Sequence, residues 1–206
     1  MVFGAAAIIT ALSVWPVTPV VILLWAAFLA FFRDPQRRIP TRPEALLSPA
    51  DGTVRDVEQV EGDGEFIGGP AMRVGIFMSV LNVHVNRSPA DGAVRYERYS
   101  PGRFHDARHP AASEENERNA IGLELEGGRR IMVTQIAGAV ARRIVCQAHP
   151  DQSLKAGQRY GMVKFGSRVE LLLPLGDQWE VVAKPGDKVR AGVDVLAVPA
   201  GHATDR

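Results

Sequence analysis

The stretch MRVGIFMSVLNVHVNRSPADGAVRYERY, residues 72–99, indicates the architecture of most of the chain. It contains three short β-type runs, Met72–Val80, Asn82–Val85 and Gly92–Tyr99, which Pro, Gly and Asp residues bound. Short apolar runs that end at such residues are typical of strands joined by tight turns. The stretch therefore predicts strands rather than helices.

The same pattern continues on both sides of this stretch. The further strand-like runs are Thr53–Val60, Ile121–Leu125, Arg130–Ile136, Val140–Cys146, Arg168–Leu173 and Trp179–Ala183. Many short strands with regular turn signals favour a sandwich or a barrel. We therefore expect a mostly β (α+β) domain of sandwich or barrel type over residues 48–206. One short helix is expected at Ser113–Asn119, where a Ser precedes a polar run and can cap it.

The N-terminal residues 2–32 differ from the rest because they carry no charged side chain. A helix that spans a bilayer needs about 20 apolar residues. Pro16 and Pro19 interrupt this run, and a Pro inside a helix kinks or breaks it. We expect a hydrophobic membrane anchor over residues 1–32, either one kinked span or a helical hairpin. A buried core helix is the alternative.

An Arg- and Pro-rich linker is expected over residues 33–47. Arg33, Arg37 and Arg38 directly follow the apolar run, and clustered Arg at such a place favours the cytoplasmic side of a membrane. The sequence therefore predicts a protein of the cell membrane with the domain at 48–206 on the cytoplasmic side. The three arginines are expected at the lipid head groups.

The composition excludes several classes of function. The 24 Lys and Arg nearly balance the 23 Asp and Glu and are scattered, which gives nucleic-acid binding little support. Cys146 is the single cysteine, so no intrachain disulfide forms, and we expect it to be a small buried apolar residue. The chain has neither a CxxC nor an HExxH motif, which argues against a familiar zinc site.

Two short segments of the chain recur. SPADG occurs at 48–52 and again at 88–92, and residues 148–161 resemble residues 183–192. Duplicated hairpins would explain both repeats. Pro-x-Asp-Gly is also good turn chemistry in its own right, and this explanation is favoured for Asp91.

Three positions are candidates for chemistry. Gly166–Ser167 precedes an apolar strand, and the Ser hydroxyl adjoins a carbonyl that Gly leaves sterically open. His84 interrupts a strand-like run and is the best-placed general base, although a hydrogen-bonded structural role is also open. Asp51 lies in the first SPADG turn, where it either caps its own backbone or orients a His beside a Ser.

These residues belong to a larger resemblance. The runs ALLSPADGTV (45–54), FMSVLNVHVNRSPADGAV (77–94), ASEENERNAIGLELEGG (112–128), IAGAVARRIVC (136–146) and VKFGSRVELLLP (163–174) occur in an order that resembles the phosphatidylserine decarboxylase family. LAFFRDPQRRIP (29–40) also fits its short bacterial and archaeal type.

The resemblance implies a proenzyme that cuts itself at Gly166–Ser167 and converts Ser167 into a pyruvoyl group, with Asp51 and His84 assisting. The products would be chains of about 1–166 and 167–206 that stay together as a heterodimer, with further dimerisation left open. The activity implied is decarboxylation of phosphatidylserine to phosphatidylethanolamine through a Schiff base, with His84 as the proton donor. The family uses neither a metal nor pyridoxal phosphate.

Two positions depart from the longer bacterial members of this family. They carry a second His where this chain has Arg87, and Leu-Gly-Ser-Thr where this chain has Phe-Gly-Ser-Arg at 165–168. The Gly–Ser pair is retained, so self-cleavage remains the expectation. The division of tasks between His84 and other residues is open.

Two alternatives remain at this point. An archaetidylserine decarboxylase would act on a lipid with the same head group, so the residues around the head group would be the same. A non-catalytic β carrier module of biotinyl or sugar-phosphotransferase IIA type would also contain SPADG and PGDKVRAG turns. Asp187–Lys188 is then the loose candidate for the modified lysine, or His84 for a phosphate acceptor.

Overall fold

The structure is a computed structural model that describes residues 17–42, 44–139, 143–164, 166–176 and 179–201. The contacts divide the chain into two units, Met1–Asp34 and Pro35–Arg206. The first unit contains one described helix, and the second contains every described strand.

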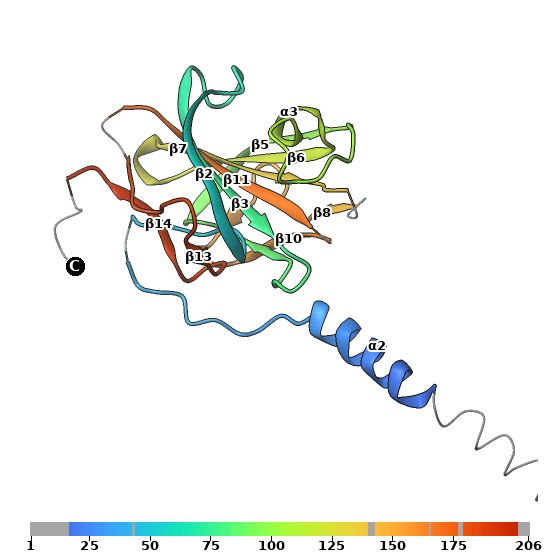
Figure 1. Ribbon diagram of the computed structural model, residues 1–206. Helices are drawn as coiled ribbons and strands as arrows, with labels where there is room; N and C mark the ends of the chain where they lie inside the picture. Colours follow the sequence, from blue (N-terminus) through green and yellow to red (C-terminus); the bar gives the residue numbers. More distant parts are fainter. Residues whose placement is uncertain (1–16, 43, 140–142, 165, 177–178, 202–206) are drawn as a thin grey trace, which may run out of the picture. The chain divides into compact units, whose positions relative to one another are not determined.

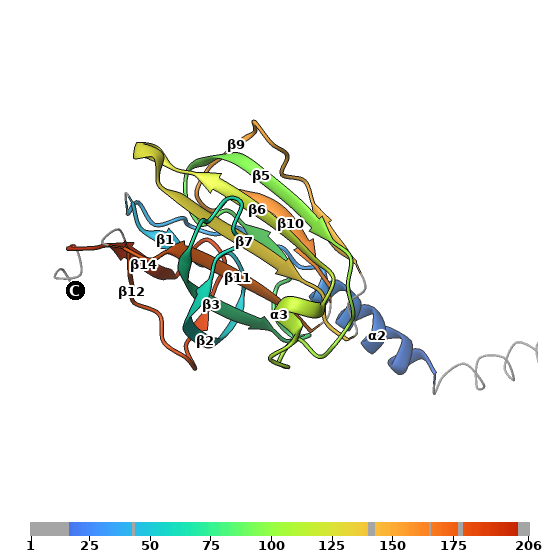
Figure 2. The same ribbon diagram turned by 90° about the horizontal axis from the view of Figure 1, so that it is seen from above.

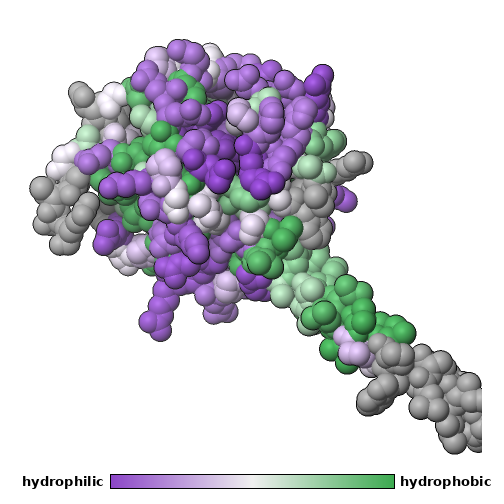
Figure 3. Space-filling model, in the orientation of Figure 1, coloured by the Kyte–Doolittle hydropathy of each residue, from purple (hydrophilic) through white to green (hydrophobic). Residues whose placement is uncertain are grey.

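Helix α2 (Thr18–Phe31) makes up the described part of the first unit. Pro19 lies in its first turn, where a missing N–H costs nothing, so Pro19 begins this helix and does not break it. Apolar side chains cover the visible face of α2 in Figure 3. Within the described ranges, no helix is long and apolar enough to cross a membrane. Pro16 lies outside these ranges, so the choice between a span and a hairpin stays a prediction.

A curled sheet of eight antiparallel strands forms the second unit (Figures 1 and 2). In sheet order it comprises β13 (Lys188–Val189), β2 (Gly52–Glu61), β3 (Pro70–Met78), β11 (Ser167–Pro174), β7 (Arg130–Ile136), β6 (Arg118–Glu124), β5 (Gly92–Ser100) and β9 (Ser153–Leu154). The prediction of a mostly β domain is confirmed.

Two small antiparallel sheets complete the unit. One contains β1 (Leu46–Leu47), β14 (Val195–Pro199) and β12 (Trp179–Val181), and the other contains β4 (Val85–Arg87), β10 (Arg159–Val163) and β8 (Ile144–Cys146). The remaining elements are the short helix α3 (Ala112–Glu115) and the 3-10 turn η1 (Glu126–Gly128).

Several predicted boundaries are wrong. The expected strand at Asn82–Val85 is a loop up to His84, and only Val85 belongs to a strand, β4. The expected helix at 113–119 ends at Glu115 because residues 118–119 already belong to β6. In both places pairing with distant strands decides the structure, and local patterns do not report such pairing.

Strand β11 lies between β3 and β7 and organises the core. Val169, Leu171 and Leu173 all belong to the main apolar cluster, because successive side chains of a strand point to opposite faces. Arg168 and Glu170 point to the other face. By the same alternation, Ser167 at the start of β11 lies on the core face.

The two SPADG turns have matching contacts. In each turn the Ser hydroxyl donates to the carbonyl of the Ala two residues later, at 2.7 Å in the first turn and 2.8 Å in the second. Asp51 Oδ1 accepts the Ala191 N–H at 2.8 Å, and Asp91 Oδ1 accepts the Ala156 N–H at 2.7 Å. Each SPADG turn therefore contacts one copy of the second repeat, the first turn contacting residues 183–192 and the second contacting residues 148–161.

Candidate active site

Ser167 is the first residue of β11 and pairs with Met78, the last residue of β3. Its side chain is fully buried. Ser167 Oγ lies 3.6 Å from Met78 Sδ and 3.4 Å from the carbonyl oxygen of Val163. The hydroxyl is therefore held inside the domain, away from bulk water, and not in an exposed loop.

Gly166 precedes Ser167 in a left-handed conformation, with φ 62°. A side chain at this position would have open space around it, so the backbone angle, and not crowding, requires a glycine. The Gly166–Ser167 peptide therefore stands at a sharp change of backbone direction directly before the strand.

Gly138 contacts the same peptide from another segment. A Cβ built on Gly138 would lie 1.8 Å from the carbonyl oxygen of Gly166, and 3.4 Å from Cβ of Ala107. Only a glycine can approach the carbonyl group so closely. The sequence did not single out Gly138, because this contact depends on how two loops meet.

His84 is also fully buried, and its Nδ1 lies 2.9 Å from the carbonyl oxygen of Asn82. A carbonyl oxygen can only accept a hydrogen bond, so Nδ1 carries a proton. In the neutral imidazole, Nε2 is then the basic nitrogen. The loop that contains Asn82 thereby sets the tautomer of the candidate base.

Asp51 has two described partners, and His84 is not one of them. Its Oδ2 accepts a hydrogen bond from Arg37 Nη2 at 2.7 Å, and its Oδ1 accepts the Ala191 N–H. The Asp51 and Arg37 side chains are 10% and 9% exposed. Arg37 is therefore an internal ion-pair partner, and the expectation that it meets lipid head groups is wrong. A catalytic role of Asp51 stays a prediction.

Arg87 occupies the position where longer family members carry a second His. Its Nη1 donates to the Gly157 carbonyl at 2.9 Å and its Nη2 donates to the Pro35 carbonyl at 3.3 Å. The Arg87 side chain is buried. Arg87 therefore joins the backbone at Gly157 to the backbone at Pro35 by hydrogen bonds.

Buried amide groups lie beside Met78. Asn86 Nδ2 is 3.8 Å from Met78 Sδ, and Gln135 Nε2 donates to Asn86 Oδ1 at 2.8 Å. Both amides are within the core. Sequence reasoning missed them, because an Asn and a Gln in strand-like runs carry no distinctive signal.

Arg168 anchors the start of β11 on the other face of the sheet. Its Nη1 and Nη2 donate to the two Asp56 carboxylate oxygens at 2.7 and 2.6 Å, and its Nε donates to Glu170 at 2.6 Å. Burial lowers the pKa of Arg168, but the hydrogen bonds to Asp56 and the charge of Glu170 raise it overall. Gly75 leaves the necessary room, since a Cβ there would lie 2.0 Å from Nη2.

A cavity of about 540 Å³ adjoins the candidate residues. Its lining includes Asp51, Ser79, Asn82, Lys188 and Arg190. Ser79 follows the strand partner of Ser167, and the Asn82 carbonyl accepts a hydrogen bond from His84, so the cavity is lined by neighbours of these two residues and not by Ser167 or His84 themselves. A larger hollow of about 640 Å³ includes Glu170 and Leu172, and therefore opens on the opposite face of the sheet.

Comparison with known proteins identifies one family that the chain is similar to. A family model described as phosphatidylserine decarboxylase matches residues 24–197. The phosphatidylserine decarboxylase proenzyme of Nitrosomonas europaea is 48% identical over 169 residues, which are 82% of this chain and 76% of the relative. The proenzyme of Desulfotalea psychrophila is 43% identical over 190 residues, or 92% and 87%. That of Burkholderia ambifaria is 46% identical over 175 residues, or 85% and 80%.

These similarities, together with the Gly166–Ser167 pair and its buried Ser, define the protein as a decarboxylase. The chain belongs to the phosphatidylserine decarboxylase family.

Proposed function

We propose that the chain cleaves itself at Gly166–Ser167 and decarboxylates phosphatidylserine to phosphatidylethanolamine at a pyruvoyl group made from Ser167. The observation that carries the proposal is the placement of this pair. A fully buried Ser hydroxyl adjoins the carbonyl of a left-handed Gly at the start of a central strand. Relatives that share this chain's family are named as proenzymes.

The cleavage uses only atoms of the chain and water. Ser167 Oγ attacks the Gly166 carbonyl carbon, and the peptide nitrogen leaves, so the amide becomes an ester. Loss of the Ser167 α-proton with rupture of the Cβ–Oγ bond releases the Gly166 carboxylate and leaves dehydroalanine. Its tautomer is hydrolysed, ammonia departs, and a pyruvoyl group begins the smaller chain.

The position of β11 supports a lasting complex of the two products. Its residues pair with β3 on one side and β7 on the other, and both partners belong to the larger product. Val169, Leu171 and Leu173 remain in the core after the cut. We therefore propose a heterodimer of residues 1–166 and 167–206.

The residues around Ser167 suit a pyruvoyl group. Met78 and Val163 contact the fully buried Ser167 side chain. Such a position keeps water away, and this favours the loss of CO2 from the substrate carboxylate. Once formed, the group supplies an electron sink for the electron pair that remains when CO2 leaves. His84 Nε2 is proposed as the base for the Ser167 hydroxyl proton, and later as the proton donor to the substrate α-carbon.

We propose that residues 1–32 anchor the enzyme in the cell membrane with the catalytic unit on the cytoplasmic side. Helix α2 is apolar on all sides, and such helices suit lipid or a large apolar partner. Anchoring concentrates the enzyme on its lipid substrate.

A carrier module is not favoured. Such a module presents its modified Lys on an exposed hairpin tip, whereas Lys188 lies within β13 and pairs with Thr53.

An archaetidylserine substrate is distinguished only by its lipid tails. The test is conversion of diacyl phosphatidylserine in vesicles by the purified full chain, with the ether lipid and the Ser167→Ala variant in parallel. Conversion of neither lipid by the wild-type chain would rule the proposal out.

A further inference from the structure

The loop between β3 and β4 carries two exposed apolar side chains. Val80 is 52% exposed, and Leu81, at 79%, is the most exposed large apolar residue in the described ranges. Figure 3 shows a compact green patch in the region where the green loop after β3 turns in Figure 1. Isolated exposed apolar residues are common, so the patch needs further support.

This loop is built to hold its tip outward. Asn82 Oδ1 accepts hydrogen bonds from both the N–H and the Oγ of Ser79, at 2.9 and 2.7 Å, and the Asn82 N–H donates to the Ser79 carbonyl at 3.0 Å. These three bonds close a turn around Val80 and Leu81. The two side chains are therefore held in water by a fixed turn.

Both ends of the loop lead to the candidate active site. Ser79 follows Met78, which pairs with Ser167, and the Asn82 carbonyl fixes the His84 ring. Ser79 and Asn82 also line the cavity that contains Lys188. Lys188 is exposed and makes no ion pair with a described residue. The two residues that flank the apolar tip thus line the same cavity as this cation.

We propose that the Val80–Leu81 tip inserts into the acyl region of an anionic phospholipid bilayer, with Lys188 at the level of the lipid phosphates. An apolar tip beside a cation is complementary to such a surface. The inference rests on the proposed function, since the opening would then face the substrate. A second copy of the chain is a poorer occupant, because a stable protein interface buries about 800 Å² on each side, far more than two side chains offer.

The test uses the full chain with a fluorophore on Leu81→Cys, in a Cys146→Ser background. Burial raises the pKa of the Cys146 thiol, and its removal leaves a single labelling site. Leu175→Cys is the matched control, because Leu175 is an exposed Leu just beyond the opposite end of β11 from Ser167. The vesicles contain phosphatidylglycerol and lipids with quenchers along their acyl chains.

We expect quenching at position 81 to exceed that at position 175 about threefold or more, because only the tip reaches the acyl chains. Equal quenching at the two positions, or no quenching at position 81, would overturn the proposal. So would an efficient disulfide between two copies of unlabelled Leu81→Cys on vesicles, which would identify a second chain as the occupant.

The same probe in the Ser167→Ala background separates this inference from the proposed function. Insertion is a property of the loop, so it should persist in the uncut chain. If the tip inserts and the wild-type chain converts no lipid, the proposed function fails and the docking surface stands. If lipid is converted without insertion, the docking surface fails alone.

Discussion

Gly138 lies against the carbonyl oxygen of Gly166, so close that a Cβ on Gly138 would sit 1.8 Å from that oxygen. The peptide bond proposed for cleavage therefore has a neighbour that only glycine can provide. Attack on the Gly166 carbonyl moves this oxygen as the carbon becomes tetrahedral, so a side chain at 138 would displace the reacting group.

Gly138→Ala is expected to slow self-cleavage by about a hundredfold or more, because a misplacement of about 1 Å has an effect of this size. The time course of the two product chains on a denaturing gel measures it. Gly68→Ala is the control, since a Cβ on Gly68 meets nothing within 4 Å and its backbone angle is ordinary. Equal cleavage rates in the two variants would show that the contact is irrelevant to the reaction.

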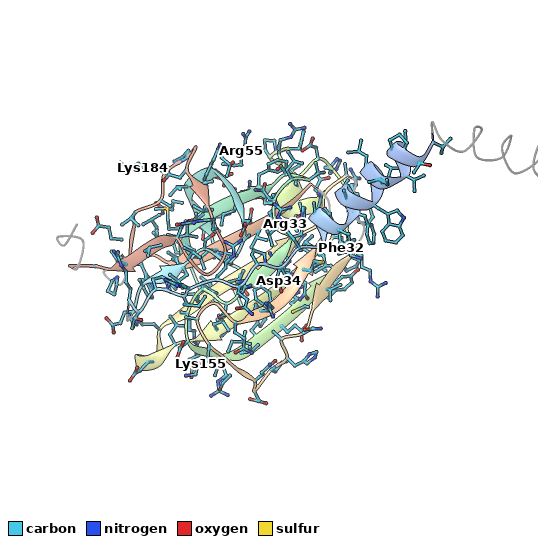
Figure 4. The ribbon with its side chains drawn as sticks, turned by 90° about the horizontal axis from the view of Figure 1, so that it is seen from below. Phe32, Arg33, Asp34, Arg55, Lys155 and Lys184 are labelled. Atoms are coloured by element: carbon cyan, nitrogen blue, oxygen red, sulfur yellow. The ribbon has the colours of Figure 1, made fainter. Side chains whose placement is uncertain are left out.

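The duplicated turns offer a matched test of Asp51. Asp51 and Asp91 each accept an Ala N–H and pair with one cation, Arg37 in the first turn and Lys155 in the second. Lys155 lies at the outer edge of the domain, away from Arg55 and Lys184 (Figure 4).

If Asp51 takes part in self-cleavage, Asp51→Asn slows the appearance of the product chains about a hundredfold or more, the usual contribution of one general acid or base. Asp91→Asn should then cleave at the wild-type rate. Comparable losses in both variants, together with a comparable fall in thermal stability, would assign Asp51 to turn formation alone.

The Arg168 network predicts a large effect on stability. Arg168 is buried between Asp56 and Glu170, so Arg168→Ala removes the cation that hydrogen-bonds to both carboxylates. Arg73 then remains as their shared ion-pair partner, with its Nε 3.7 Å from each. We expect a loss of about 3–5 kcal/mol in the free energy of unfolding, as for other broken buried pairs. Arg98→Ala removes an exposed pair with Glu65 and should cost about 1 kcal/mol or less. Urea unfolding of the uncut Ser167→Ala chain measures both, and similar costs would contradict the structure.

Tyr160 predicts how stability changes in alkali. Burial raises the pKa of the Tyr160 phenol well above its usual value, so the folded protein keeps the proton where the unfolded chain loses it. The unfolded chain then binds fewer protons, and stability falls as pH rises above about 10.

Tyr160→Phe should reduce this alkaline loss. At pH 7 the substitution should be neutral or stabilising, because the hydroxyl has no hydrogen-bond partner among the described residues. Urea unfolding at pH 7 and at about pH 10.5 compares the two proteins. A variant that loses stability in alkali as steeply as the wild type would place the titration elsewhere.

The sequence predicted the class of fold because the signals for strands and turns are local. The run Arg168–Leu173 alternates along one strand, and β11 contains it. The loop at residues 82–84 was predicted as strand, because the hydrogen bonds from Ser79 to Asn82 override an apolar strand-like pattern. The local sequence pattern therefore predicted the presence of strands more reliably than the residues at which they begin and end.

The candidate site was predictable only in part. Gly166, Ser167 and His84 lie in motifs that resemble a family. The structure places Ser167 at the start of β11 and His84 in the loop after β3, the strand that pairs with β11. Gly138 and Asp56, the distant partner of Arg168, were missed, because they come from segments far away in the sequence and act through close approach or charge. Arg37 was misplaced at the membrane for the same reason, since its ion pair with Asp51 depends on tertiary packing.

The central claim is self-cleavage, and the intact mass of the purified protein under denaturing conditions tests it most directly. We predict two chains, residues 1–166 and 167–206, with a pyruvoyl group in place of the amine at the start of the smaller one. The Ser167→Ala variant should remain one chain of 22.4 kDa, the mass of the whole sequence. A single uncut chain in folded wild-type protein would contradict the account.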